Sequence, residues 1–260
     1  MTEPMLTKNT DKLRQEVAVH VAADSIVQGN YWNEESQKGC FIGCLAHSSD
    51  PSTSEITYGL PVMVQRIAED IFEALKTDDA KAFFAALPDA VGCDGKDLSK
   101  VGWQFLAAEL RSLPKQSVNI QTVIDPVIAG MDLLSAGEEW TAANAVDAAD
   151  AAHAAYIDYA AYAAYAAANA AYAAAANAAR APAYAADAAA VNAAAAARAP
   201  AAARAPAAVN AAAAVNAAAG DRAPAAYAAY AYAADAAVRL RQRNLLLQLI
   251  STAPVVEVYE

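Results

Sequence analysis

The chain has few cysteines and no apolar leader, and each absence narrows its class. Its three cysteines, Cys40, Cys44 and Cys93, are too few for the disulfide framework of a small secreted protein. The first residues contain no basic and apolar signal segment. Together these features predict a cytoplasmic protein with free thiols.

Positive charge is also scarce. The 260 residues include 18 Lys and Arg against 29 Asp and Glu, which gives a formal net charge of -11, and the acidic excess is concentrated in residues 1–140. A protein that binds DNA or RNA needs basic side chains to neutralise the phosphates. We therefore expect no nucleic-acid partner.

What the chain has in excess is alanine, which dominates residues 141–238. Alanine is the strongest helix former, so this tract should be helical wherever proline allows. Proline disfavours helix in the residue before it, and each Arg-Ala-Pro sequence is therefore interpreted as a corner between helices. These prolines are Pro182, Pro200, Pro206 and Pro224. The pattern predicts short, closely packed, antiparallel alanine-rich helices.

Three other interpretations of the tract fit less well. Residues 159–179 are uncharged and long enough to span a bilayer, but their asparagines and tyrosines lie in a background no more apolar than alanine. We therefore expect no membrane partner. Ice-binding proteins share the alanine content, yet the tract lacks their regular threonine spacing. Low-complexity disorder is disfavoured by sparse charge and high helix propensity.

Outside the tract, apolar residues recur with the 3.6-residue helical period, which predicts an all-α fold. We expect an acidic helical head domain at residues 1–140, the alanine-rich helical tract at 141–238, and a C-terminal helix end and tail at 239–260 that docks on the head. The head helices are expected at residues 11–27, 61–75, 77–87 with Pro88 as a stop, 97–113, and 117–134, the last as a kinked or divided helix in preference to a strand.

A final helix is expected over residues 225–250, with a bulky apolar stripe near its end. Arg239, Arg241 and Arg243 lie on this helix. They are better placed to meet the acidic head than a nucleic acid, either in the same chain or in a second copy.

The run from Gly39 to His47 contains the most suggestive short motif. In a helix Cys40, Cys44 and His47 would fall at i, i+4 and i+7, on one face. Two sulfurs and an imidazole could bind a soft metal ion, or His47 could lower the pKa of a thiol. Free cysteine is also among the most buried residue types, so core packing is the alternative. His20 is interpreted as a partly buried structural histidine.

The helix expected at residues 61–75 carries carboxylates on its polar face. Glu69 and Glu73, at i and i+4, and Asp70 could hold a hard metal ion or act as an acid and base pair. A solvated helix face shows the same pattern. The candidate catalytic residues are Cys40, Cys44, His47 and Glu73, and the candidate metal ligands are Cys40, Cys44, His47, Glu69 and Asp70. No cofactor is expected, and a bound metal ion is the alternative.

Four segments give the head a family resemblance: Gly29-Asn30-Tyr31-Trp32, the GCxxGCxxH run from Gly39 to His47, Tyr58-Gly59-Leu60-Pro61 leading to Glu69–Glu73, and Asp97-Leu98-Ser99. They resemble a family of uncharacterised bacterial and phage-borne helical proteins in which a similar head precedes an alanine-rich tail. The resemblance covers about residues 15–110. It implies an architecture and offers no mechanism.

No strong catalytic motif accompanies the helical periodicity. The leading expectation is therefore a structural or protein-interaction module built from packed helices, with a protein partner or self-association. The alternative is a small hydrolase or metal-dependent enzyme that uses the cysteine, histidine and carboxylate residues of the head.

Overall fold

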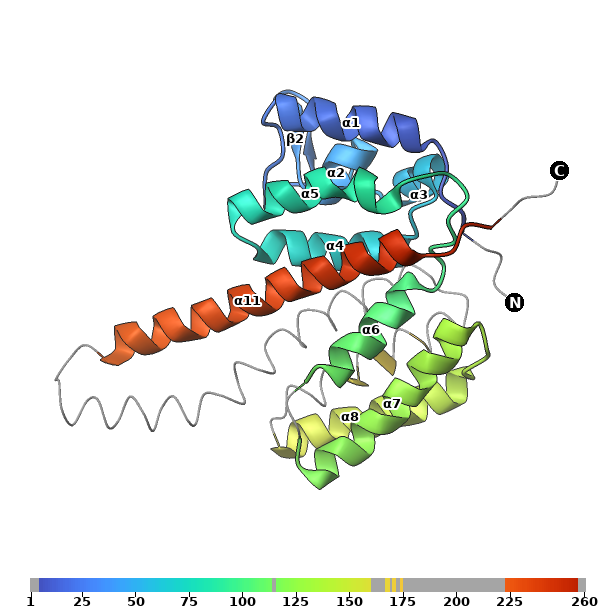
Figure 1. Cartoon of the computed structure of the whole chain (residues 1–260). Helices are drawn as coiled ribbons and strands as arrows, with labels where there is room; N and C mark the ends of the chain where they lie inside the picture. The colour runs from blue at the N-terminus through green and yellow to red at the C-terminus, as the bar shows by residue number, and fades with distance from the viewer. Residues whose placement is uncertain are drawn as a thin grey trace.

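The computed structural model describes residues 5–113, 116–159, 167, 168, 170, 171, 174 and 223–256. Over these residues the chain is almost entirely helical, which confirms the all-α prediction (Figure 1). The helices are α1 (Thr10–Ala22), α2 (Phe41–Ala46), α3 (Ser52–Tyr58), α4 (Val62–Ala74), α5 (Thr77–Val91), α6 (Val101–Arg111), α7 (Val118–Ala136), α8 (Ala142–Tyr159) and α11 (Ala223–Thr252). A short antiparallel pair, β1 (Trp32–Asn33) and β2 (Lys38–Gly39), precedes α2.

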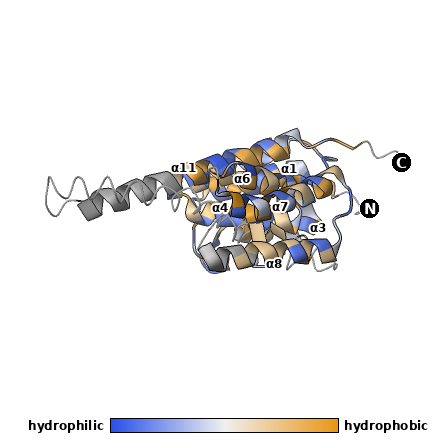
Figure 2. Ribbon diagram, turned by 90° about the horizontal axis from the view of Figure 1, so that it is seen from below, coloured by the Kyte–Doolittle hydropathy of each residue, from blue (hydrophilic) through white to orange (hydrophobic). Residues whose placement is uncertain are grey.

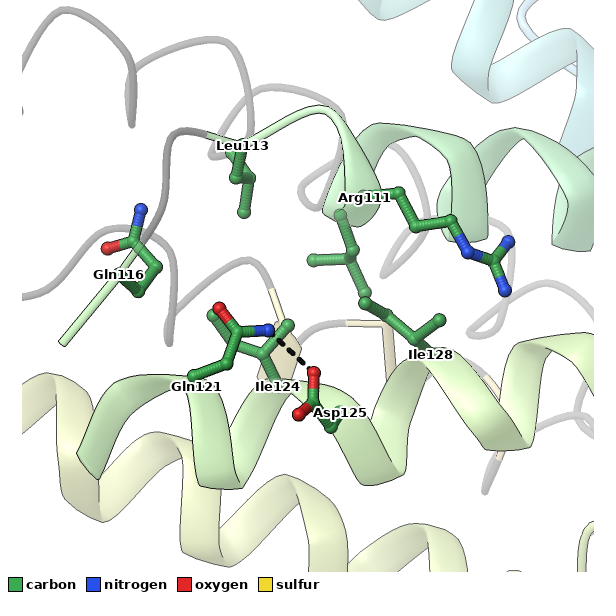
Figure 3. Close-up of a pocket in the computed structure, with 8 residues that line it drawn as sticks. Arg111, Leu113, Gln116, Gln121, Ile124, Asp125 and Ile128 are labelled. Atoms are coloured by element: carbon green, nitrogen blue, oxygen red, sulfur yellow. Dashed lines mark hydrogen bonds between the residues drawn. The ribbon is translucent and has the colours of Figure 1, made fainter. Parts of the chain in front are cut away.

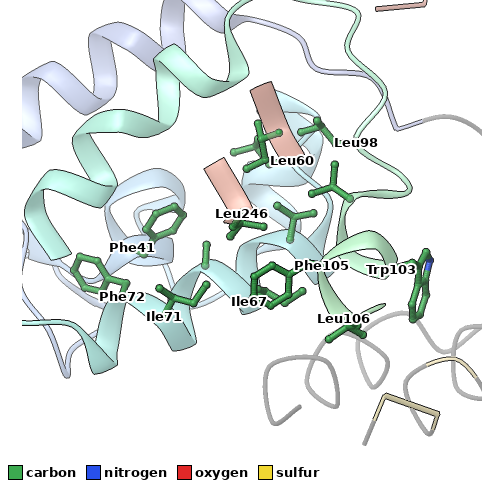
Figure 4. Packing of buried hydrophobic residues seen from close by; sticks show 14 of the residues in the cluster. Phe41, Leu60, Ile67, Ile71, Phe72, Leu98, Trp103, Phe105, Leu106 and Leu246 are labelled. Atoms are coloured by element: carbon green, nitrogen blue, oxygen red, sulfur yellow. The ribbon is translucent and has the colours of Figure 1, made fainter. Parts of the chain in front are cut away.

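Aromatic side chains anchor α2 in the hydrophobic core, as Figure 4 shows in part. The ring of Phe41, the first residue of α2, lies 6.1, 5.3 and 5.5 Å, centroid to centroid, from the rings of Phe72, Phe83 and Phe84. Each such pair adds about 0.5–1.5 kcal/mol beyond the area that it buries. The GCxxGCxxH run is therefore fixed at its start by α4 and α5.

The last helix, α11, packs against α4, α5 and α6. Leu246 and Ile250 are buried in the core, and hydrophobic and hydrophilic residues alternate along α11 in Figure 2, as expected for a helix with one buried face. Its three arginines pair with acids of the head: Arg239 with Asp70, Arg241 with Glu109 and Arg243 with Asp79. In the structure this helix packs on the head, and its arginines meet acidic residues of the same chain.

The α7 segment is a single helix that continues through Pro126, so helix was the correct choice over strand. Gly130 lets α7 meet Trp140 directly, because a Cβ atom on Gly130 would lie 2.3 Å from the indole ring. In α8 three alanines at helical spacing are fully buried, namely Ala145, Ala149 and Ala152. This part of the alanine-rich tract packs through its methyl groups.

The first helix is shorter than the sequence pattern indicated. It ends at Ala22 instead of Val27, because Asp24 takes a left-handed backbone conformation (φ 49°) and the amide of Ser25 folds back to the carbonyl of His20. The apolar residues that seemed to extend the helix include Ile26, which pairs with Gly39 in a parallel bridge. The spacing of apolar residues alone did not distinguish a longer helix from a helix followed by a β-bridge.

The prediction that Pro88 stops a helix was also wrong. The α5 helix runs through Pro88 to Val91 and ends at Gly92, which has a φ of 75°. Proline removes one helical hydrogen bond, yet its φ is compatible with the helix. Burial of Leu87, Pro88 and Val91 in the core offsets that loss.

Within the described part of the chain, no helix is long and apolar enough to cross a membrane. The Arg-Ala-Pro corners at Pro182, Pro200 and Pro206 and the helices expected between them lie outside the described residues.

Candidate metal centre

Three side chains from two helices converge at one edge of the head. Glu16 Oε1 lies 3.1 Å from His20 Nε2 and 2.8 Å from His47 Nε2, and the two ring nitrogens are 3.2 Å apart. These are His and carboxylate atoms of the kind that bind zinc, iron and related divalent ions. They form the group of potential metal ligands found among the described residues.

Helix geometry places two of the three residues. Glu16 and His20 are four residues apart on α1, so they lie one turn apart on the same face. The buried face of α1 includes Leu13, Val17 and His20, and Glu16 lies at the border of that face. Burial of the apolar residues therefore brings the His20 ring against α2 and leaves the Glu16 carboxylate within reach of it.

The third ligand comes from the end of α2. His47 caps this helix in the left-handed conformation (φ 50°), and its amide donates to the carbonyl of Gly43 at 2.8 Å. Histidine is one of the few non-glycine residues enriched in this conformation. The His47 ring stacks on Trp32 at 4.5 Å between centroids with an interplanar angle of 11°, which fixes its orientation.

Two glycines of the GCxxGCxxH run bring Trp32 to that position. A Cβ atom on Gly39 would lie 2.3 Å from the carbonyl oxygen of Tyr31, and one on Gly43 would lie 1.3 Å from the same atom. The backbone before β1 thus lies directly against the start of α2, where the amide of Cys40 donates to the carbonyl of Asn30 at 2.8 Å. This close contact places Trp32 beside the two imidazoles.

Ser25 contacts the other ring nitrogen of His20. Its hydroxyl oxygen lies 2.7 Å from His20 Nδ1 and 3.3 Å from the His20 carbonyl oxygen. In the tautomer that is protonated at Nδ1, this nitrogen donates to Ser25 and the hydroxyl donates to the carbonyl. The lone pair of Nε2 then faces Glu16 and His47, as in metal-binding histidines whose other nitrogen donates to an oxygen.

Hydrogen bonds connect only some of the atom pairs in the cluster. The two ring nitrogens can supply at most two protons, so at most two of the three contacts between Glu16, His20 and His47 can be hydrogen bonds. Whichever ring nitrogens carry the protons, the third contact brings together two donors or two acceptors. A cation between the three atoms would attract all of them, because neutral imidazole nitrogen and carboxylate oxygen are both electron-pair donors.

Electrostatics favour the ligand form of His20. Burial lowers the pKa of His20; the charge of Glu16 opposes this shift, and His47 adds to it. His20 is therefore neutral at pH 7, which is the form that binds a metal ion.

No family model, curated protein or solved structure matches the chain. The role of the cluster therefore has to be argued from its ligand atoms, their spacing and the bonds of the side chains behind them.

Of the residues selected from the sequence, the structure brings His47 into this cluster and places the cysteines elsewhere. Cys40 and Cys44 are buried, and burial raises the pKa of each thiol to about 12. Cys40 donates to Glu69 Oε1 at 3.3 Å, and Cys44 donates to the carbonyl of Gly39 at 3.2 Å. Both thiols are protonated at neutral pH, which disfavours them as nucleophiles and as ligands.

The three candidate carboxylates of α4 also have separate partners. Glu69 pairs with Arg66 at 2.9 Å and Asp70 pairs with Arg239 at 2.7 Å. Glu73 accepts a hydrogen bond from the amide of Gly29 at 2.7 Å, and burial raises its pKa. The structure therefore joins Cys40 to Glu69 but does not bring these acids to His47.

Sequence reasoning missed Glu16, Ser25 and Trp32 and interpreted His20 as structural. His20 is indeed buried, with 5% of its surface exposed. A signal was present, because Glu16 and His20 have the i, i+4 spacing of a paired ligand set on a helix. The contribution of His47 could not be foreseen, since it depends on how α2 packs against α1.

A hollow of about 320 Å³ lies between the end of α6 and the first half of α7 (Figure 3). Leu110, Leu113, Ile124 and Ile128 are its apolar lining residues. Its polar lining residues are engaged: Gln121 donates to Asp125 at 2.6 Å, and Arg111 pairs with Asp132. The hollow does not include the Glu–His–His cluster.

Proposed function

We propose that this protein is a metal-dependent enzyme whose head domain holds one divalent transition-metal ion through Glu16, His20 and His47. The observation that carries the proposal is the convergence of two imidazole nitrogens and one carboxylate oxygen within 3.2 Å of one another. Such an ion supplies Lewis acidity and lowers the pKa of a water molecule bound to it.

The number of protein ligands favours catalysis over a purely structural ion. Structural zinc sites are closed by four protein ligands, whereas catalytic sites keep a position open for water or substrate. The cluster offers three ligands, and the His47 side chain is 49% exposed, so small molecules can reach it from solvent. His20, buried and fixed by Ser25, provides the rigid side of the site.

The expectation of an interaction module rests on helical periodicity and on the absence of a strong catalytic motif, and most of the alanine-rich tract lies outside the described residues. The candidate metal centre lies within the described head and makes the more specific proposal. It also replaces the cysteine-based version of the enzyme hypothesis, because both buried thiols have raised pKa values.

Metal analysis of the purified chain tests the proposal. We expect one equivalent of divalent metal after loading and dialysis in the wild type, and a loss of at least about tenfold in affinity in Glu16→Gln and His47→Ala. Cys44→Ala serves as the control and should keep the metal. Metal-dependent turnover is then sought with a panel of activated carboxylic and phosphoric esters.

Equal metal binding by Glu16→Gln, His47→Ala and the wild type would contradict the proposal. Loss of the metal in Cys44→Ala alone would point back to the cysteines. A loaded protein that cleaves none of the esters would remove the support for hydrolysis and leave the metal centre in place.

A further inference from the structure

We infer that the hollow between α6 and α7 is a binding site for a small amine, a ligand with one ammonium group and an apolar body. The hollow shares no residue with the candidate metal centre, so this inference does not depend on the proposed function. It rests on the helix face that lines the hollow, on its volume and on the charge that its ion pairs leave uncompensated.

One face of α7 lines one side of the hollow. The residues that it contributes are Gln121, Ile124, Asp125 and Ile128. Their spacing of i, i+3, i+4 and i+7 places the four side chains on the same face of the helix. This face presents two polar and two apolar side chains to one space. The ligand that matches it has a polar group and an apolar body.

Apolar side chains line a space that is large enough for a small molecule. Leu110 and Ile124 are almost fully buried, whereas Leu113 and Ile128 are only partly buried. The volume of about 320 Å³ lies within the range of small-molecule sites, about 300–1,000 Å³. Transfer of an apolar group from water into this space is favourable, because it covers apolar surface that water otherwise contacts.

The charge of Asp125 decides which polar group fits. Arg111, the cation among the described lining residues, extends away from Gln121 and Asp125 and pairs with Asp132 (Figure 3). The partner of Asp125 is the uncharged amide of Gln121. The carboxylate of Asp125 therefore attracts a cationic ligand and repels an anionic one.

The bond between Gln121 and Asp125 also orients the Gln121 amide. A carboxylate only accepts hydrogen bonds, so the NH₂ group of Gln121 faces Asp125 Oδ1, at 2.6 Å. The amide oxygen lies on the side away from Asp125 (Figure 3). This oxygen and Asp125 Oδ2 are acceptors that receive no hydrogen bond from the groups that the structure describes. An ammonium group carries three N–H donors and matches such a site.

Calorimetric titration of the full chain with 2-phenylethylamine tests the inference. We expect saturable binding with a dissociation constant in the millimolar range, since the ligand has few atoms. 3-Phenylpropionate carries a similar apolar body on an anion, and methylamine carries the ammonium group alone; both should bind at least about tenfold more weakly. Absence of binding by 2-phenylethylamine, or equal binding by either comparison compound, would overturn the inference.

Asp125→Asn removes the charge and keeps the size of an exposed side chain, so the fold should be retained. We expect it to bind 2-phenylethylamine about two- to fivefold more weakly, as for the loss of one exposed ion pair. Glu139→Gln, an exposed carboxylate outside the hollow, is the matched control and should bind like the wild type. Equal affinity in Asp125→Asn and the wild type would contradict a role for this carboxylate.

Methyl NMR locates the bound amine. The methyl signals of Ile124 and Ile128 should shift during the titration, whereas those of Ile67, in the core and outside the hollow, should not. Shifts that leave Ile124 and Ile128 unaffected would place the amine elsewhere and overturn the inference.

Sedimentation velocity distinguishes a small ligand from a second copy of the chain as the occupant. A dimer that dissociates in Asp125→Asn would show that another protomer covers the hollow, and this result would overturn the inference. An unchanged sedimentation coefficient together with amine binding supports the small-molecule site.

Discussion

Gly43 shows how one missing side chain permits the packing beside the metal centre. Its Cβ position lies 1.3 Å from the Tyr31 carbonyl oxygen, so an alanine would push the backbone of α2 away from the backbone at Tyr31. We expect Gly43→Ala to destabilise the head by more than about 3 kcal/mol, at the upper end for overpacking. Urea unfolding followed by circular dichroism measures this.

Gly29→Ala is the matched control for that substitution. Gly29 has a left-handed backbone (φ 80°), unlike the helical Gly43, and no atom lies within 4 Å of its Cβ position. The loss of stability in Gly29→Ala should be limited to the backbone strain of about 1–2 kcal/mol. Equal unfolding midpoints for the two variants would show that the contact with Tyr31 is not as close as described.

Ser25 acts on the metal centre through His20, as a positioning residue. Ser25→Ala removes the hydroxyl that contacts Nδ1 of His20. Without this partner, the ring has less preference for the tautomer that binds metal through Nε2. Partners of this kind are worth about 10–100-fold in metal affinity. Calorimetric titration should show a loss of that size, and Ser25→Thr should restore most of it. An unchanged affinity in Ser25→Ala would exclude this role.

Among the helices, α11 is attached to the head by charge as well as by apolar contact. Glu109 of α6 is fully buried and accepts hydrogen bonds from Arg241 at 2.9 and 2.8 Å and from Gln242 at 2.8 Å. A buried carboxylate with these partners fixes α11 in one register against α6. The Lys96 ammonium group adds a second attachment, since it donates to the carbonyl of Ser251 at 2.7 Å.

Glu109→Gln should therefore weaken the docking of α11. Breaking a fully buried ion pair costs about 3–5 kcal/mol, but the Arg241 side chain is 40% exposed and can be hydrated, so we expect about 2 kcal/mol. Asp79→Asn removes the partner of Arg243, which lies 3.5 Å away in a more exposed pair, and should cost less than about 1 kcal/mol. Comparison of urea midpoints tests the ranking, and the reverse order would contradict it.

The helices were more predictable from the sequence than the metal centre. Periodic apolar residues located α4 and the C-terminal half of α11, because burial of one helix face requires that period. The ends of α1 and α5 were not predictable in this way, since a left-handed Asp24 and a buried Pro88 depend on tertiary packing. Glu16 and His20 could be paired from their spacing, whereas His47 joins them only through the contact between α1 and α2.

The head as a unit should respond to metal binding. An ion that binds the folded state alone stabilises it by about 2.7 kcal/mol at a concentration one hundred times its dissociation constant. We expect cobalt(II) or manganese(II) to raise the melting temperature of the wild type and a chelator to reverse the rise. In His47→Ala the shift should be absent, since one of three ligands is gone. A shift of equal size in that variant would place the bound ion elsewhere.

The pH dependence of stability should also depend on the centre. In the metal-free protein burial lowers the pKa of His20 from 6.5, and the group faces Glu16 and His47. The unfolded state therefore binds a proton more readily, so the stability contributed by neutral His20 is full above about pH 6.5 and is lost as pH falls through the lower pKa of the folded state. His20→Gln should flatten this part of the profile of urea midpoints against pH. With metal bound the decline should become steeper, because protons then also compete with the ion for His20. If the pH profiles with and without metal are parallel, the titration of His20 does not depend on the ion. This result would contradict a site in which His20 binds the metal.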